Sequence, residues 1–178
     1  MKLIGVKKVE AGWLLVEVLI VLAIAGIFWS VSNHYWHSLV FSNQVSQGAE
    51  RIRVALEFAR ASAIGLGEKV VFCASLDQQH CGGFWEDGQI VVTESGKILR
   101  VLPRLTKSER LVWRANLARK ERIEFLPDGT TNGYWGSFFY CAGSSNRNYQ
   151  ARSLIVNVSG SSRVSTKDAK GRSVTCEF

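Results

Sequence analysis

The sequence predicts an α+β fold, in which one long N-terminal helix packs on an antiparallel β-rich C-terminal domain. Residues 13–31 form an apolar run whose single charged residue is Glu17. No proline occurs before Pro103, so nothing interrupts a helix that starts in this run. From residue 68 onward, short β-rich segments alternate with turn residues. With 178 residues, the chain holds one domain plus an extension.

The first half of the helix, residues 13–32, is predicted to span a membrane. A transmembrane helix needs about 20 apolar residues, and the run supplies 19. Three lysines, Lys2, Lys7 and Lys8, precede the run, which favours a cytoplasmic N-terminus and a C-terminal domain on the other side. A carboxylate such as Glu17 costs about 2.5 kcal/mol or more inside a bilayer. We therefore expect Glu17 to have a partner or a function.

The second half, residues 33–67, is predicted to be an amphipathic continuation of the same helix. Its apolar residues recur at helical spacing, at Val45, Ala49, Ile52, Leu56, Ala59 and Ala63. Charged residues, including Arg51 and Glu57, fill the opposite face. Gly65 and Gly67 then predict the end of the helix.

The remaining residues, 68–178, are predicted to form a β-rich domain outside the cytoplasm. Turn signals such as Asp87-Gly88, Asn132-Gly133 and Ser159-Gly160 separate its strands. The expected strands cover residues 69–74, 89–93, 98–102, 111–113, 122–125, 137–141, 152–158 and 174–176.

Four cysteines lie in this domain, an even number outside the cytoplasm, so disulfides are expected. Three pairings are possible. We favour Cys73 with Cys81, which closes a short polar loop, and Cys141 with Cys176, which ties the C-terminal end back to a strand. A zinc site that combines these thiols with His80 is the alternative, but the spacing of Cys73 and Cys81 matches no zinc-finger pattern. We expect no metal and no cofactor.

Sequence motifs of enzymes are absent. The chain has no Gly-x-Ser-x-Gly, no phosphate-binding glycine-rich loop and no His-Glu-x-x-His. His34 and His37 flank two aromatic residues after the apolar run, a pattern typical of a membrane–water interface. We therefore expect no catalytic residue and no enzymatic activity.

The N-terminus resembles the class III signal of type IV prepilins and type II secretion pseudopilins. Gly12 ends a short basic leader, and Glu17 is the fifth residue after it. The resemblance implies that prepilin peptidase removes residues 1–12, that Trp13 is then N-methylated, and that Glu17 pairs with the terminal amine of a neighbouring subunit. Trp13 stands where Phe is commonest and Leu14 where Thr is common. An ordinary secretory signal peptide is the alternative.

The C-terminal domain is similar to the GspH/FimT branch of the type IV pilin-like proteins. The similarity rests on Phe72-Cys73, on Cys81, and on the segments 85–92, 98–100, 123–129, 137–141 and 152–160, in this order. It implies a minor pilin or pseudopilin with a pilin-like fold. Such a protein is a single-pass protein of the bacterial inner membrane with a periplasmic domain, and it assembles with other pilin subunits into an extracellular filament.

The C-terminal part is also rich in basic residues, set among Ser, Asn, Gly and Thr. They are Arg147, Arg152, Arg163, Lys167, Lys170 and Arg172. Such a segment can neutralise phosphates without reading bases, although a solvated tail is equally compatible with its composition. A second basic stretch between Arg100 and Arg122 contains interleaved acidic residues, so we rank it second. The chain as a whole carries a formal net charge of +7, which favours an anionic partner.

FimT-like minor pilins of naturally transformable bacteria bind DNA through a basic C-terminal region with a Gly-Arg-x-Arg type motif. Here the segment 160–163 keeps the glycine, Gly160, and the last arginine, Arg163, but has Ser161 at the first arginine. The resemblance implies sequence-nonspecific DNA binding for uptake in natural transformation. The alternative is pseudopilin H of a type II secretion system, which has no role in DNA binding.

Overall fold

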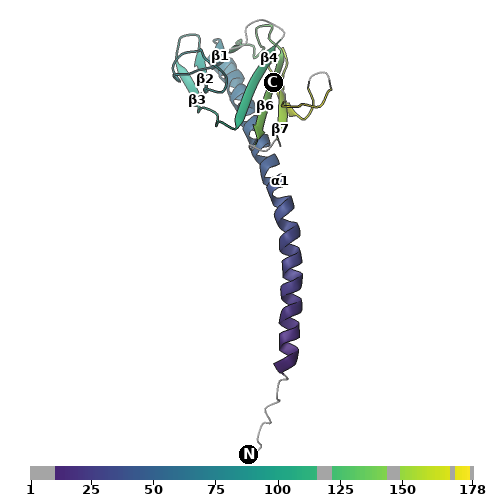
Figure 1. Cartoon of the computed structure of the whole chain (residues 1–178). Coiled ribbons are helices and arrows are strands. Elements are labelled where there is room, and N and C mark those ends of the chain that lie inside the picture. The colour runs from purple at the N-terminus through teal and green to yellow at the C-terminus, as the bar shows by residue number, and fades with distance from the viewer. Residues whose placement is uncertain (1–10, 116–121, 144–148, 169–170, 177–178) are drawn as a thin grey trace, which may run out of the picture. The chain divides into compact units, whose positions relative to one another are not determined.

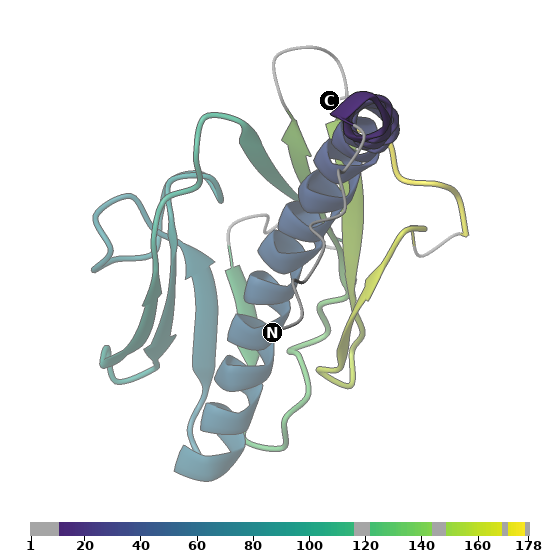
Figure 2. The ribbon, with the colours of Figure 1, turned by 90° about the horizontal axis from the view of Figure 1, so that it is seen from below.

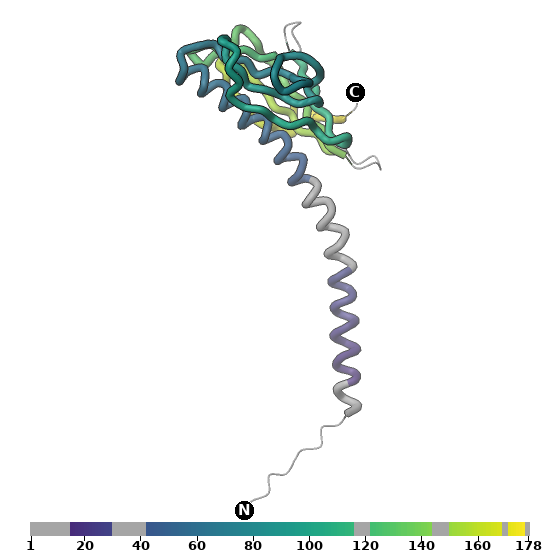
Figure 3. The backbone as a smooth tube through the Cα atoms, turned by 90° about the vertical axis from the view of Figure 1, so that its left-hand side faces the viewer, coloured from purple at the N-terminus to yellow at the C-terminus, as the bar shows by residue number. Residues whose placement is uncertain are grey.

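The structure is a computed structural model that describes residues 11–115, 122–143, 149–168 and 171–176. Within these ranges it describes all side chains except those of residues 11–14, 30–41 and 149; Figure 3 draws these residues, and all those outside the ranges, in grey. The chain divides into two units, Met1–Phe41 and Ser42–Phe178. Most of the predicted leader, residues 1–10, lies outside the described residues, as do Arg147 and Lys170.

The first unit contains the start of one helix, α1 (Ala11–Leu66). Its large apolar side chains from Leu15 to Trp29 are 49% to 77% exposed, and Glu17 is exposed among them. Within the described part of the chain, no helix offers a stretch long and apolar enough to count as a membrane span.

The second unit is built around the C-terminal half of α1. All six residues of the predicted apolar stripe, from Val45 to Ala63, are at most 1% exposed, and Ala55 joins them. The helix ends where Gly67 adopts a φ of +66° and its N–H donates to the carbonyl of Ala63 at 3.0 Å. This left-handed glycine is a common way of ending a helix. The predicted amphipathic helix is therefore confirmed.

Two antiparallel four-stranded sheets pack with this helix (Figures 1 and 2). The first sheet has the order β3-β2-β1-β5, with β1 (Val70–Ala74), β2 (Gln89–Thr93), β3 (Ile98–Leu102) and β5 (Arg122–Phe125). The second has the order β4-β6-β7-β8, with β4 (Glu109–Ala115), β6 (Gly136–Gly143), β7 (Tyr149–Val156) and β8 (Ser162–Ser165). Figure 1 shows β1–β3 on one side of the unit and β4, β6 and β7 on the other. The predicted α+β class is confirmed.

Two strand predictions were wrong. The sequence did not predict β8, because four residues of which three are serine or arginine carry little β signal. Conversely, residues 174–176 form no strand. Their valine and cysteine suggested a strand, but Cys176 is held by a disulfide and not by a ladder of backbone hydrogen bonds.

Aromatic side chains join the two sheets in the core. Phe72 of β1 meets Phe138 of β6 edge to face, with ring centroids 6.2 Å apart. Trp85 stacks on Phe72 and meets Phe138 edge to face at 4.8 Å, and Trp113 lies on another side of Phe138. Such ring pairs add about 0.5–1.5 kcal/mol each beyond the area they bury.

The start of β4 is clamped to the centre of β6. The Tyr140 hydroxyl donates a hydrogen bond to Oε1 of Glu109, and Thr106 donates to Oε2 of the same carboxylate. Burial alone would raise the pKa of Glu109, but these hydrogen bonds outweigh it and hold the pKa below its usual range. Gly48 of α1 lies against the Tyr140 ring, since a Cβ there would be 2.1 Å from its hydroxyl. The clamp thus fixes both β4 and the helix against β6.

The expectation of disulfides is also confirmed. Cys73 is joined to Cys81 and Cys141 to Cys176, the two pairs that the sequence favoured. The first closes the loop after β1. The second ties the C-terminal segment to β6.

Candidate functional site

Basic side chains of the second sheet fall on two opposite faces. In the strand register, Arg114 lies opposite Ser137, Ser137 opposite Ile155, and Ile155 opposite Arg163. Because directly opposite residues share a face, Arg114 and Arg163 project from the same side of the sheet. Tyr140, which contacts α1 at Gly48, belongs to the other side. The side with Arg114 and Arg163 therefore faces away from the helix, and we call it the outer face.

Arg152 does not share this surface. It lies opposite Tyr140 in the register, which places it on the helix side of the sheet. Its Nη2 donates to Oγ of Ser42 on α1 at 3.3 Å, and its Nη1 donates to the carbonyl of Ala151 at 3.0 Å. Of the predicted DNA-binding residues, Arg152 and Arg163 therefore lie on opposite sides of the sheet, whereas Lys167 and Arg172 lie in the segment that follows β8.

The C-terminal segment, of which the structure describes residues 166–168 and 171–176, lies across the outer face. Ser153 of β7 donates from Oγ to the carbonyls of Ser165 and Lys167, and Cys176 is bonded to Cys141 of β6. Ser153 is fully buried and Cys141 is 1% exposed, although both belong to the side away from the helix. The segment that covers them is thus a packed part of the domain.

Within this segment the chain makes a tight turn that presents Arg172. Lys167 pairs antiparallel with Ser173, and the N–H of Asp168 donates to the carbonyl of Arg172 at 2.8 Å. The Asp168 carboxylate accepts from the Arg172 backbone at 2.8 Å and from its Nε at 2.9 Å, and lies 2.8 Å from its Nη2. This double contact fixes the arginine side chain relative to the turn.

Arg114 reaches the same place from β4. Its guanidinium lies over the ring of Phe139 of β6, 5.1 Å from the ring centroid, a cation–π arrangement. Arg114, Phe139, Asp168 and Arg172 line one cavity of about 260 Å³, together with residues 173–175. We define the basic outer face as Arg114, Arg163, Lys167 and Arg172, all of them exposed.

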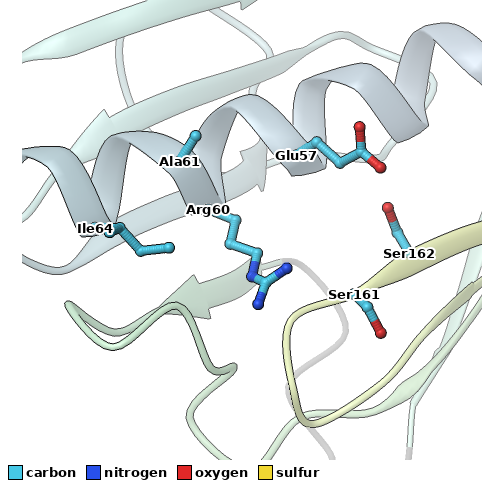
Figure 4. Close-up of a pocket in the computed structure, with 6 residues that line it drawn as sticks. All are labelled: Glu57, Arg60, Ala61, Ile64, Ser161 and Ser162. Carbon is cyan, nitrogen blue, oxygen red and sulfur yellow. The ribbon is translucent and has the colours of Figure 1, made fainter.

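The glycine of the segment 160–163 has a structural role. Gly160 occupies the turn between β7 and β8 with a φ of +77°, and a Cβ there would lie 2.0 Å from the carbonyl oxygen of Gly129. Arg60 of α1 donates from Nε to that same oxygen at 2.9 Å. Figure 4 shows Arg60 extending from the helix toward Ser161 of this turn, beside Ser162 at the start of β8. The turn is therefore locked to the helix, while Arg163 projects from the outer face.

The second basic stretch, ranked second from the sequence, is not one surface. Arg100 lies over the ring of Phe58 on α1, 5.4 Å from its centroid, and Arg104 pairs with Asp87 at 3.1 Å. Arg110 shares the outer side of the second sheet with Arg114, because it lies opposite Cys141, but it pairs with Glu86 at 3.5 Å. Arg114 joins the basic outer face, which the sequence analysis did not propose. Arg114 could have been found from the alternation of side chains between the two faces of β4, together with the disulfide that joins Cys176 to β6.

The other candidate residues that the structure describes do not gather at a reactive centre. His80 is exposed, with Nδ1 2.7 Å from Oδ2 of Asp77, and its hydrogen bonds to that carboxylate hold the pKa of Asp77 well below its usual range. Among the residues that the structure describes, no group of three or more His, Cys, Asp or Glu side chains is placed to hold a metal ion. The side chains of Trp13, His34 and His37 are not among those that the structure describes, and Gly12 lies in the first turn of α1.

The second unit matches a known protein family, and its fold matches solved structures. Residues 48–161 match the family model described as type II transport protein GspH. No curated protein matches the sequence. The fold is similar to two crystal structures of the type IV minor pilin FimU from Pseudomonas aeruginosa PAO1. One is 19% identical, with 73% of this chain and 96% of that chain covered and a TM-score of 0.56. The other is 21% identical, with 71% and 98% covered and a TM-score of 0.51. At these identities the likeness shows the fold.

Proposed function

Since this chain belongs to the family of type II transport protein GspH and has a pilin-like fold, we propose that it is a minor pilin or pseudopilin. Prepilin peptidase would cleave after Gly12, leaving an N-methylated Trp13. Before assembly, the mature subunit would be anchored in the bacterial inner membrane with its second unit in the periplasm. It would then assemble with other pilin subunits into a type IV pilus or a related filament.

The first unit supports this assembly role. The spacing of Gly12 and Glu17 fits the prepilin pattern, and the large apolar side chains between Leu15 and Trp29 are exposed in the single chain. Such a surface needs lipid or other apolar helices around it. A buried carboxylate is tolerated when a cation pairs with it, and the free amine of a neighbouring subunit would be that cation for Glu17.

We further propose that the subunit binds DNA through the basic outer face, without sequence preference, for uptake in natural transformation. The observation that carries this proposal is that Arg163 projects from the outer face, and that the exposed residues Lys167 and Arg172 belong to the segment that is packed across that face. Lys and Arg side chains that face solvent can bind the phosphate backbone without reading bases. Arg147 and Lys170, which the sequence predicted for the same role, lie outside the described residues. Arg152, bonded to Ser42 of the helix, is not part of it.

A second candidate function is that of pseudopilin H in a type II secretion system. The family description itself, type II transport protein, favours it. In that case the partners are other minor pseudopilins and secreted proteins. The two functions differ in whether the basic outer face binds DNA.

Gel-shift binding of a short duplex to the full chain in a non-ionic detergent separates them. We expect binding at low salt. In a plot of the logarithm of the binding constant against the logarithm of the salt concentration, each neutralised phosphate should contribute about −0.9 to the slope. Replacing Arg163, Lys167 and Arg172 together by Gln should make this negative slope less steep by about 3. The matched control removes the same charge at Lys97, Arg104 and Lys107, which lie on loops outside the second sheet. Absence of binding by the unmodified chain at low salt would refute DNA binding and leave the secretion role.

A further inference from the structure

We propose that Arg114 and Arg172, together with Phe139, form a pocket that binds one phosphodiester group of DNA, and that Asp168 and the Cys141–Cys176 disulfide position it. This inference rests on the proposed DNA binding and goes beyond it. It adds two residues, Arg114 and Phe139, that neither the sequence motifs nor the family resemblance indicate. It also makes binding depend on the geometry of a pocket as well as on net charge.

The two guanidinium groups come from distant parts of the chain. Arg114 lies in β4 and Arg172 in the turn of the C-terminal segment, yet both line the same cavity of about 260 Å³. Arg114 stacks on Phe139 and has no hydrogen-bond or ion-pair partner among the described residues. Its planar fork of N–H donors therefore remains available, and this fork matches the oxygens of a phosphate.

An aspartate in a phosphate pocket is at first sight unfavourable, because like charges repel. The side chain of Asp168 is only 12% exposed, however, whereas that of Arg172 is 72% exposed. The carboxylate is thus directed into the protein, where it holds Nε and the backbone N–H of Arg172. Asp168 acts as a positioning residue, and the exposed part of the arginine remains for the ligand.

The wall of the pocket depends on the C-terminal disulfide. Residues 173–175 line the cavity and directly precede Cys176, whose only described covalent attachment to the sheet is the bond to Cys141. The remaining contacts of the segment with the sheet that bear on the pocket are the hydrogen bonds of Ser153. Without the disulfide, residues 173–176 are attached to the sheet through the pairing of Ser173 with Lys167 and of Val174 with Thr166, so the position of Arg172 relative to Arg114 is less tightly fixed.

The test is the affinity of the full chain, in a non-ionic detergent, for a short fluorescent duplex, measured by anisotropy at low salt. We expect Arg114→Gln and Arg172→Gln each to weaken binding about tenfold, the loss typical of a charge-assisted hydrogen bond. The matched control Arg104→Gln removes one exposed arginine elsewhere and should change affinity by about twofold at most. The double variant should lose less than the product of the single losses, because the two residues share a ligand.

Asp168→Asn gives the sharpest contrast between a pocket and simple attraction. The substitution raises the net charge by one, so attraction by charge alone would tighten DNA binding. A pocket that needs Arg172 in place predicts weaker binding.

The disulfide variants test the same dependence on position. Replacing Cys141 and Cys176 by Ser should weaken binding, whereas the same change at Cys73 and Cys81 should not. Thermal unfolding of each variant checks that the domain remains folded.

Each outcome is decisive for one of the two proposals. If the unmodified chain binds no DNA, the proposed function fails. If it binds but Arg114→Gln behaves like Arg104→Gln, or Asp168→Asn tightens binding, the pocket is refuted while the proposed function stands.

A competition experiment distinguishes DNA from lipid as the source of the phosphodiester. It compares the dinucleotide d(TpT) with glycerophosphoglycerol, the phosphodiester of a lipid headgroup, as competitors of the duplex. Stronger displacement of DNA by the lipid headgroup would overturn the assignment to DNA.

Discussion

Replacing Glu17 by alanine is expected to remove the subunit from filaments while leaving its insertion into the membrane intact. Insertion depends on the apolar run, which becomes more apolar when the carboxylate is removed. In the assembly proposed above, Glu17 pairs with the terminal amine of a neighbour, and the loss of the carboxylate leaves that amine buried and unpaired. Breaking such a pair costs about 3–5 kcal/mol, which corresponds to a loss of about a hundredfold or more in incorporation.

The measurement is the amount of subunit in sheared filaments relative to the amount in membranes, for the unmodified chain and for the variant. Val16→Ala is the control, since it changes an adjacent exposed side chain of α1 and leaves the carboxylate in place. Incorporation of Glu17→Ala at the unmodified level would exclude the pairing role.

Gly160→Ala is expected to destabilise the second unit more than substitution of any glycine in an open turn. A side chain at a left-handed φ costs about 1–2 kcal/mol. The added Cβ also meets the carbonyl oxygen of Gly129 at 2.0 Å and Arg60 Nε at 3.0 Å, and such overpacking costs about 1–3 kcal/mol more. The β7–β8 turn must therefore move away from α1, with a total loss of about 2–5 kcal/mol in the free energy of unfolding.

Gly96→Ala provides the matched comparison. Gly96 also has a left-handed φ, of +88°, in a hairpin turn with an equivalent backbone hydrogen bond, but a Cβ there meets nothing within 4 Å. Denaturant unfolding of both variants measures the difference. Equal losses would show that Gly160 is required only for its φ, and that the contact with Gly129 is unimportant.

The sequence predicted the elements whose burial follows a regular period. The stripe from Val45 to Ala63 repeats at helical spacing because a single face of α1 meets the core, and every residue of it is buried. The favoured cysteine pairs also agree with the structure. The helical stripe is a local pattern of the sequence, and the cysteines allow only three pairings.

The site could be predicted only in part, because it depends on how two sheets are arranged. Arg152 and Arg163 are both basic residues of one hairpin, but the register places them on opposite faces. Arg114 and Arg172 are far apart in sequence, and only the pairing of β4 with β6 and the bond from Cys141 to Cys176 bring them to one cavity. Composition alone carries no information about either relation.

The central proposal is that this chain is a processed pilin-like subunit, and mass spectrometry of its N-terminus in membranes tests it most directly. The expected N-terminal peptide begins at Trp13 and carries one additional methyl group on its amine. A chain that retains Met1 or the leader up to Gly12, or that is cut elsewhere in the apolar run, would contradict the proposal and indicate an anchored domain that does not assemble.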